Sequence, residues 1–184
     1  RVEKISKGMS VLNVFSYTGG FSLYAARGGA SQVTSVDIST PATEAAMRNF
    51  GLNQDLPAAG GRTVGQCRHI PVAEDAFQFM RDAAQSGQKF DVVIVDPPSM
   101  ANKASLRGVA IKRYQELASL AAQVVRPGGK VVLASCSSRV SNDQFFSACQ
   151  SGVAQAGKFL SELEQTQHAI DHPLTFEEGS YLKC

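Results

Sequence analysis

Long hydrophobic runs are missing from this sequence, and no apolar stretch approaches the 18 residues or so that a membrane-spanning helix needs. The chain opens on a charged segment, RVEKISKG, and no signal peptide pattern is present there. Because the opening residue is not methionine, we expect a piece of a longer protein. These absences predict a segment that does not cross a membrane and that works in the cytoplasm.

Closely spaced cysteines are also absent. The four cysteines are Cys67, Cys136, Cys149 and Cys184, and no two of them form a CxxC pair. A structural zinc site is therefore not expected, and the sequence predicts no other metal. Thiols stay reduced in a cytoplasm, so a cysteine in a special position is a candidate nucleophile.

An excess of charge of either sign is the third absence. The chain has 18 Lys and Arg against 16 Asp and Glu, a formal net charge of +2. This balance permits an RNA partner, but domains that bind nucleic acid through charge alone are usually more basic. With 43% hydrophobic residues among 184, the chain is expected to fold as one domain spanning residues 1–184.

Apolar runs of strand length alternate with helical patterns along most of the chain. Strands are predicted at residues 10–15, 32–39, 65–72, 90–98 and 130–138, and helices at residues 20–29, 40–53, 73–87, 105–125 and 142–157. The tail after residue 157 predicts an edge strand, a loop and the start of a last strand. This alternation predicts a mainly parallel sheet covered by helices on both faces. Ligands bind beyond the carboxyl ends of such strands, so the residues after each strand are the site candidates.

The turn after the first strand, VFSYTGGF, has few glycines for a nucleotide loop. Gly19 and Gly20 are its glycines, and Phe15 and Tyr17 stand where small residues are usual. Asp37 ends the second strand, near the spacing of about 20 residues between a nucleotide loop and its ribose-binding acid. Neither GxGxxG nor GxxxxGK[ST] occurs, which argues against NAD and against ATP in a P-loop. A nucleoside without phosphates, S-adenosylmethionine, fits better; the structural alternative is a tight turn with a capping acid.

Asp75 follows the third predicted strand and has two interpretations. Its carboxylate can accept the adenine amino group, or it can begin the next helix as an ordinary acidic residue. The predicted cofactor-binding residues are Phe15, Ser16, Tyr17, Thr18, Gly19, Gly20, Asp37, Ile38, Ser39, Asp75, Ala76, Asp96 and Pro97.

The stretch VVIVDPPS ends the most apolar strand of the chain. Pro97 restricts Asp96 to extended geometry and Pro98 restricts Pro97, which predicts a rigid carboxylate at the edge of the sheet. Burial beside the Val and Ile run raises the cost of an idle charge, so a functional Asp96 is favoured. A strand end with a capping Asp is the structural alternative.

Cys136 follows the next strand, in VVLASCSS. Adjacent parallel strands predict that Cys136 and Asp96 lie near each other, whereas Cys149 fits a buried position on an amphipathic helix. His172, beside Pro173, fits a structural role better than a catalytic one. Lys103, Arg107, Lys112 and Arg113 either touch phosphates or form a solvated helix face. The predicted substrate-binding residues are Pro98, Ser99, Arg113, Ser135 and Ser137.

The segments VLNVFSYTGGFSLYAARGG, VDIS, DPPS and SCSS resemble the catalytic domain of bacterial 23S rRNA (cytosine-5)-methyltransferases that carry an N-terminal PUA domain. RYQEL, RPGG and DHP…EGSYLK follow in the expected order, so the resemblance covers nearly the whole chain. The sequence departs from the family pattern in two ways. It has Ser99 where relatives commonly carry Lys, and the PUA and linker parts are absent upstream.

The resemblance implies a Rossmann-like class I methyltransferase fold of the α/β class. Its sheet is expected to be mostly parallel and seven-stranded, with helices on its flanks and a last strand that is antiparallel and truncated. Cys136 would attack carbon 6 of a cytosine, Asp96 would bind the base at N3 and N4, and S-adenosylmethionine would methylate carbon 5. Ribosomal RNA is the implied partner, and a homodimer is allowed. The rival interpretations are a guanine methyltransferase, a non-catalytic cofactor-binding module and a different Rossmann enzyme.

Overall fold

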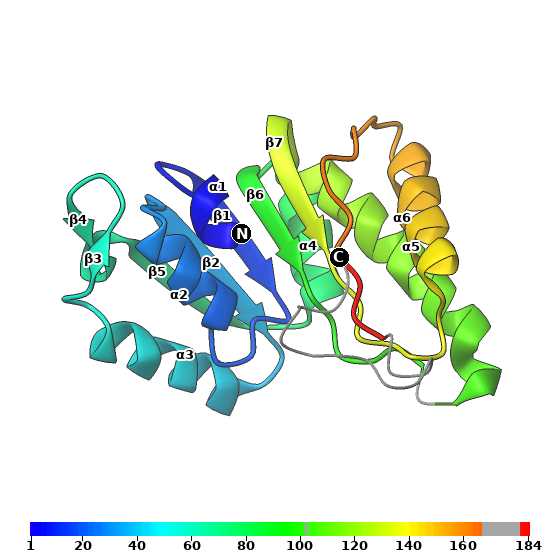
Figure 1. Cartoon of the computed structure of the whole chain (residues 1–184), viewed down its shortest axis with the longest axis horizontal. Coiled ribbons are helices and arrows are strands. Elements are labelled where there is room, and N and C mark those ends of the chain that lie inside the picture. The colour runs from blue at the N-terminus through cyan, green and yellow to red at the C-terminus, as the bar shows by residue number, and fades with distance from the viewer. Residues whose placement is uncertain (102, 167–180) are drawn as a thin grey trace. The chain divides into compact units, whose positions relative to one another are not determined.

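Five strands form the central sheet, in the order β5-β2-β1-β6-β7 (Figure 1). The computed structural model describes residues 1–101, 103–166 and 181–184. The strands are β1 (Ser10–Val14), β2 (Gln32–Asp37), β5 (Arg68–Ala73), β6 (Phe90–Val95) and β7 (Val125–Leu133). β1 pairs with β2 in parallel, and so does β2 with β5. The α/β class and the parallel sheet predicted from the sequence are confirmed.

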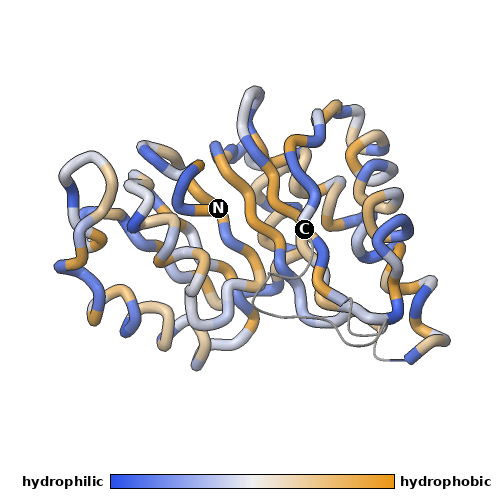
Figure 2. Tube along the Cα trace, viewed as in Figure 1, coloured by the Kyte–Doolittle hydropathy of each residue, from blue (hydrophilic) through white to orange (hydrophobic). Residues whose placement is uncertain are grey.

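Continuous apolar runs explain why these segments become interior strands. Val92, Val93, Ile94 and Val95 of β6 are each at most 1% exposed. Figure 2 shows β6 as a hydrophobic stretch over most of its length. A strand with no polar face must be covered on both sides, which is the arrangement that helices flanking a parallel sheet provide.

Six α-helices accompany the sheet in the residues that the structure describes. They are α1 (Val2–Ile5), α2 (Gly20–Arg27), α3 (Thr40–Leu52), α4 (Ala76–Gln85), α5 (Arg107–Val124) and α6 (Asn142–Gln155). Two 3-10 turns, η1 (Val64–Gln66) and η2 (Ala104–Leu106), and an antiparallel pair, β3 (Pro57–Ala58) and β4 (Arg62–Thr63), complete the described elements. Within that part of the chain no helix has the length and hydropathy to cross a membrane.

The chain divides into two compact units. The first holds Arg1–Ile94 with Val124–Val131, and the second holds Val95–Gln123 with Val132–Cys184. In the second unit α5 and α6 lie side by side, and the ring of Tyr114 meets that of Phe145 edge to face at 5.1 Å (Figure 1). Gly152 leaves no room for a Cβ against the Gln115 carbonyl oxygen, so α6 approaches the α5 backbone closely.

The C-terminal segment agrees only in part with the prediction. Lys183 forms an antiparallel bridge with Ser135, and Cys184 exchanges backbone hydrogen bonds of 2.7 and 3.0 Å with Thr166. The antiparallel direction agrees with the expected last strand. The described residues hold five strands of the sheet, and much of the tail where the others were expected, His172 included, lies outside them.

Three local features were not predicted from the sequence. Helix α1 and the β3–β4 pair were not predicted at all. RPGG, expected as the turn that ends the long helix, lies within β7, because the strand begins at Val125 directly after α5. The central prediction of strand and helix alternation is unaffected by these differences.

A buried polar chain ties four elements of the first unit together. Asn13 on β1 donates to the Ser22 hydroxyl on α2 (2.9 Å), and Ser22 shares a hydrogen bond with Ser35 on β2 (2.7 Å). Ser35 in turn bonds Nε2 of His69 on β5 (2.8 Å), and the His69 ring stacks on Phe50 with centroids 3.7 Å apart. This chain fixes the start of α2 against the sheet, directly after the turn that follows β1.

Burial lowers the pKa of His69 from its ordinary 6.5 to about 4. The unfolded chain therefore takes up a proton before the folded one as the pH falls, so folding stability is lost between pH 7 and pH 4. Because the ring is only partly buried, we expect a contribution on the order of 1–2 kcal/mol.

Urea unfolding of the wild type and of His69→Gln at pH 7 and pH 4.5 measures this contribution. The wild type should lose more stability over this interval than the variant, since glutamine does not titrate there. Equal losses in the two proteins would show that His69 is not the group responsible.

Candidate active site

The turn between β1 and α2 has an unusual backbone. Phe15 (φ 58°) and Tyr17 (φ 48°) are the non-glycine residues with positive φ in the described chain, and Gly19 has φ 82°. Each left-handed non-glycine residue costs about 1–2 kcal/mol, so it persists only where its surroundings hold it. Residues of this kind cluster at ligand sites, which makes this turn the first candidate.

Contacts from three elements hold the turn. They are the Ser16 N–H to the Val36 carbonyl (3.0 Å), the Asn49 amide to the Thr18 carbonyl (2.9 Å), and the edge-to-face rings of Phe15 and Phe77 (6.1 Å). The strained backbone is therefore fastened to β2, α3 and α4, all within the first unit. The aromatic ring at position 15 is explained by its packing against Phe77, whereas the Tyr17 side chain is 70% exposed.

Asp37, at the end of β2, is bonded directly to this turn. Its Oδ2 accepts from the Tyr17 N–H (2.8 Å), and its Oδ1 accepts from the Ser39 N–H (2.9 Å). Each carboxylate oxygen has two lone pairs, so both can still accept a ligand hydroxyl. The next side chain, Ile38, is 74% exposed and offers an apolar surface beside the carboxylate. The structure thus brings together the turn and the acid that the sequence selected.

Gly19 has a steric reason to be glycine as well as a conformational one. A Cβ built on it would lie 2.9 Å from Cβ of Ala46, whereas a Cβ on Gly20 meets nothing within 4 Å. Close by, the hydroxyl of Ser16 is buried and has no hydrogen-bond partner among the described residues. A turn with a tight backbone and an unsatisfied hydroxyl fits a ligand-binding loop.

Three other predicted cofactor residues have structural roles. Asp75 accepts from the Gln78 N–H (2.9 Å) and caps α4, and Ser39 accepts from the Ala42 N–H (3.3 Å) and caps α3. Ala76, in the first turn of α4, is 3% exposed. The capping interpretation of Asp75 is confirmed, and its contact with adenine stays a prediction.

The second candidate cluster lies in the second unit and centres on Cys136. Its Sγ is 3.9 Å from the carbonyl oxygen of Pro97, and the Ala134 N–H donates to the Val95 carbonyl at 2.9 Å. The segment after β7 therefore runs beside the double proline that follows β6. The sequence prediction that Cys136 and the Asp96 segment are neighbours is confirmed.

Asp96 is a half-buried carboxylate without a partner in the described chain, where no hydrogen bond or ion pair reaches it. Burial raises the pKa of this carboxyl above its ordinary value of 3.8. Burial also raises the pKa of the Cys136 thiol, and the negative charge of Asp96 raises it further. A partly desolvated acid beside a thiol is typical of a reactive site, because idle buried charges are costly.

Ser135 and Ser137 were predicted to bind substrate, but the structure gives the hydroxyls of both serines internal partners. They are 2% and 0% exposed, so neither hydroxyl can meet a large ligand. Ser135 donates to the Tyr114 hydroxyl (2.8 Å) and accepts from the Ser137 N–H (3.2 Å), and Ser137 donates to the Ala101 carbonyl (3.5 Å). The two serines anchor the cysteine segment from inside.

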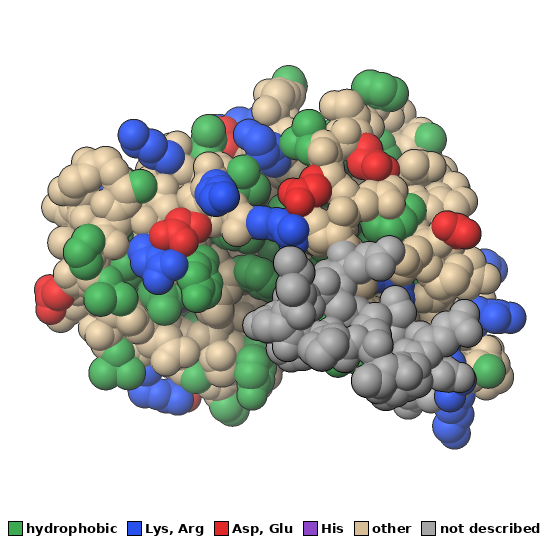
Figure 3. All heavy atoms as spheres, viewed as in Figure 1, with side chains coloured by type: hydrophobic (Ala, Val, Ile, Leu, Met, Phe, Trp, Pro, Cys, Tyr) green, Lys and Arg blue, Asp and Glu red, His purple; other side chains and the backbone are tan. Residues whose placement is uncertain are grey.

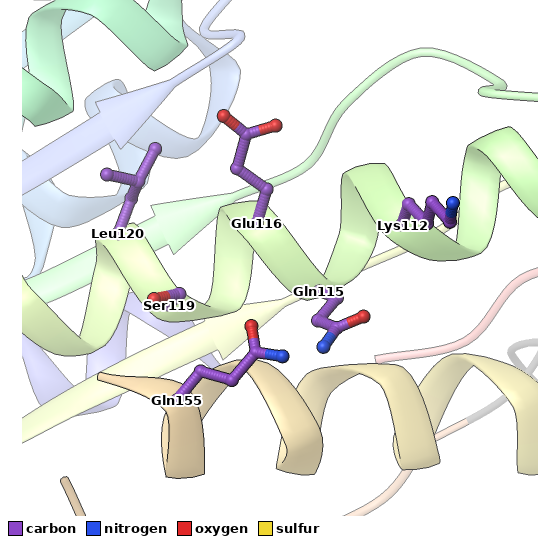
Figure 4. A pocket seen from close by; sticks show the side chains of 6 residues that line it. All are labelled: Lys112, Gln115, Glu116, Ser119, Leu120 and Gln155. Atoms are coloured by element: carbon purple, nitrogen blue, oxygen red, sulfur yellow. The ribbon is translucent and has the colours of Figure 1, made fainter. Parts of the chain in front are cut away.

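The remaining predicted substrate residues stay predictions. Pro98 and Ser99 are exposed, beside the thiol segment and accessible to a ligand. Arg113 lies on α5 and pairs with Glu116 at 3.4 Å on the surface. A groove of about 330 Å³ between α5 and α6 contains none of the predicted cofactor, catalytic or substrate-binding residues, although Lys112, a candidate phosphate contact, lines it (Figure 4). Its lining is Lys112, Gln115, Glu116, Ser119, Leu120 and Gln155.

Sequence reasoning missed Asn49, Tyr114 and Lys183, which hold the two clusters in place. Asn49 donates to the Thr18 carbonyl, 31 residues away, and Lys183 donates to the Ser137 carbonyl, 46 residues away. No local sequence pattern predicts contacts between residues so far apart in the chain. The available signal was weaker: a lysine within the short run YLKC, at the start of the expected last strand.

Comparisons with known proteins point to one family. A family model described as S-adenosylmethionine-dependent methyltransferase matches residues 1–173. The chain is 45% identical over 184 residues to a ribosomal RNA large subunit methyltransferase of Deinococcus radiodurans, covering 100% of this chain and 43% of the relative. It is 39% identical over 186 residues to ribosomal RNA large subunit methyltransferase I of Pseudoalteromonas translucida, covering 99% and 44%.

A solved structure agrees with this relationship. SMU.776 complexed with SAH superposes with a TM-score of 0.80 at 28% identity, covering 99% of this chain and 46% of that one. The chain thus spans less than half the length of these relatives.

The two neighbouring glycines of the turn provide a matched pair of substitutions. Gly19→Ala should lower the free energy of unfolding by about 2–3 kcal/mol, because alanine is strained at φ 82° and meets Ala46. Gly20→Ala should change it by less than about 1 kcal/mol, since its Cβ enters open space. Urea denaturation measures both, and equal effects at the two positions would contradict the geometry described for the turn.

Proposed function

The chain belongs to the S-adenosylmethionine-dependent methyltransferase family, and we propose that it methylates carbon 5 of a cytosine in large-subunit ribosomal RNA. The observation that carries this proposal is the Cys136 thiol beside the Asp96-Pro97 segment, with the acid unpaired in the described chain. Cytosine carbon 5 is a poor nucleophile, and a thiol next to an acid is the chemistry that can activate it.

The turn between β1 and α2 fits the nucleoside part of S-adenosylmethionine. The Asp37 carboxylate retains lone pairs for the ribose hydroxyls, and the exposed Ile38 side chain offers an apolar face to the adenine. The cofactor, when bound, supplies a methyl group activated by a positively charged sulfur. The turn itself has no Lys or Arg, which agrees with a ligand that carries no phosphate.

Cys136 acts as the nucleophile toward the base. Its thiolate forms a bond to carbon 6 of the cytosine, which shifts the electron pair of the 5,6 double bond toward carbon 5 and makes that atom nucleophilic. After methylation, loss of the carbon 5 proton restores the double bond and releases the thiolate. The enzyme is regenerated with the cysteine unchanged.

Asp96 holds the edge of the same base. Burial raises the pKa of its carboxyl, which favours sharing a proton with the base, so the group can hydrogen-bond N3 while accepting from the N4 amino group. This interaction stabilises the negative charge that moves into the ring when the thiolate adds. The rigid double proline suits this task because it limits the positions the carboxyl can take.

The RNA partner is supported by the names of the relatives, which are ribosomal RNA large subunit methyltransferases. On the face drawn in Figure 3, Lys and Arg side chains are scattered among acidic and uncharged ones. Among the described residues of either unit on this face, the basic side chains do not gather into one surface, so shape and unpaired bases are the features that we propose for recognition. We place the protein in the cytoplasm, where ribosomal RNA is modified, and keep the homodimer as a prediction.

The test uses the full-length protein, labelled S-adenosylmethionine and large-subunit ribosomal RNA that lacks its usual methylation. Digested RNA should carry the label in 5-methylcytidine, and Cys136→Ala should lower the rate by more than about 1,000-fold, as loss of a nucleophile does. Cys149→Ala serves as the matched control, because this thiol is buried and belongs to the packing of α6.

Other outcomes of this assay identify the rival functions. Label in a guanine nucleoside, or full transfer by Cys136→Ala, would discard the cytosine mechanism. Cofactor binding without transfer to any RNA would instead support a module that only binds the cofactor.

A further inference from the structure

Lys183 is a buried lysine that the mechanism above does not use. It is 3% exposed, and lysine is almost never buried to this extent unless it is paired. Its ammonium donates to the carbonyl oxygens of Ser137 (2.7 Å) and Tyr181 (3.2 Å), and no carboxylate of the described chain pairs with it. Burying a cation is costly when its partners are neutral carbonyl oxygens, as both partners of Lys183 in the described residues are, so a role for this charge is worth seeking.

Lys183 is bonded to the chain on both sides of Cys136. Its backbone exchanges two hydrogen bonds with Ser135, from the Ser135 N–H (2.8 Å) and to the Ser135 carbonyl (3.0 Å). Its ammonium reaches the carbonyl of Ser137, the residue that follows the cysteine. The position of the thiol between these two anchors therefore depends on Lys183.

The charges around the thiol oppose each other. Burial and the carboxylate of Asp96 raise the pKa of Cys136, and the ammonium of Lys183 lowers it. The same burial lowers the pKa of Lys183, and the charge of a Cys136 thiolate raises it again. The phenol of Tyr114 is a further polar group near the thiol, because it accepts a hydrogen bond from Ser135, the residue before Cys136. Lys183 is thus the cation, within the described chain, that favours the thiolate.

We propose that Lys183 is a positioning residue for the nucleophile, which fixes the turn around Cys136 and supplies the positive charge that the thiolate needs. This inference rests on the proposed function in giving Cys136 its catalytic role. A neutral side chain of similar length would fill the same space at a lower desolvation cost. It would, however, remove the positive charge that favours the thiolate, whereas burial and the charge of Asp96 would still disfavour it.

The direct test measures alkylation of Cys136 by iodoacetamide in the full-length protein as a function of pH, with the modified peptide identified by mass spectrometry. Lys183→Gln keeps a hydrogen-bond donor without charge, and Lys183→Met keeps neither. Both should react at least about threefold more slowly at pH 7.5, with profiles moved to higher pH, because the thiolate is the reacting form. Lys158→Met, which removes an exposed lysine after α6, should leave the profile unchanged.

The other thiols report whether a variant is folded. Cys149 is 8% exposed, so we expect it to be unreactive both in the wild type and in each folded variant. If Cys149 becomes reactive in Lys183→Met, that variant is misfolded, and the proposal is tested with Lys183→Gln, whose side chain is closer to lysine in volume and polarity. An unshifted profile in folded Lys183→Gln overturns the proposal.

Methyl transfer gives an independent comparison. The pH profile of kcat in Lys183→Gln should move in the same direction as alkylation, while KM for S-adenosylmethionine should stay unchanged. A raised KM with an unmoved pH profile would overturn the electrostatic role. If the proposed function is wrong, transfer survives in Cys136→Ala, whereas the alkylation profiles still decide how Lys183 affects the thiol.

Discussion

Parallel pairing of β1 with β2, in register from Ser10–Gln32 to Val14–Val36, is the constraint on which the first cluster depends. Because the two strands run in the same direction, they end together, and the Asp37 carboxylate reaches the Tyr17 N–H at 2.8 Å. That hydrogen bond, with the Asn49 contact to Thr18, holds a turn whose residues adopt costly left-handed conformations. The turn is stable with few glycines because hydrogen bonds to neighbouring elements hold the positive φ angles, which glycine would adopt without strain.

The second cluster depends on incomplete pairing of buried groups. Asp96 is partly desolvated and unpaired in the described chain, and within the same residues the buried ammonium of Lys183 bonds to carbonyl oxygens. Both lie next to the cysteine segment, where their opposite charges shift the pKa of Cys136 in opposite directions. The serines and Tyr114 around the thiol, by contrast, are satisfied by hydrogen bonds.

Much of the fold and half of the site could be read from local pattern. The VVIVDPPS stretch predicted an interior strand followed by a rigid acid, and VVLASCSS predicted a cysteine at the next strand end. Both predictions are confirmed in place, because continuous apolar runs leave parallel interior strands as the way to bury them. Spacing also paired the turn after β1 with Asp37. The burial of Ser135 and Ser137 could not be predicted in this way, because a hydroxyl near a cysteine looks the same in sequence whether it faces a ligand or the interior.

The sequence by itself determined the order of elements, the two strand-end clusters and the family resemblance, since these follow from hydrophobic period and from residues adjacent in the chain. The tertiary structure alone decided which groups are buried and what they contact. It turned the two serines inward and brought Lys183 to Ser137 across 46 positions. Desolvation and long-range hydrogen bonds depend on what the rest of the chain places around a residue, so no local pattern could announce them.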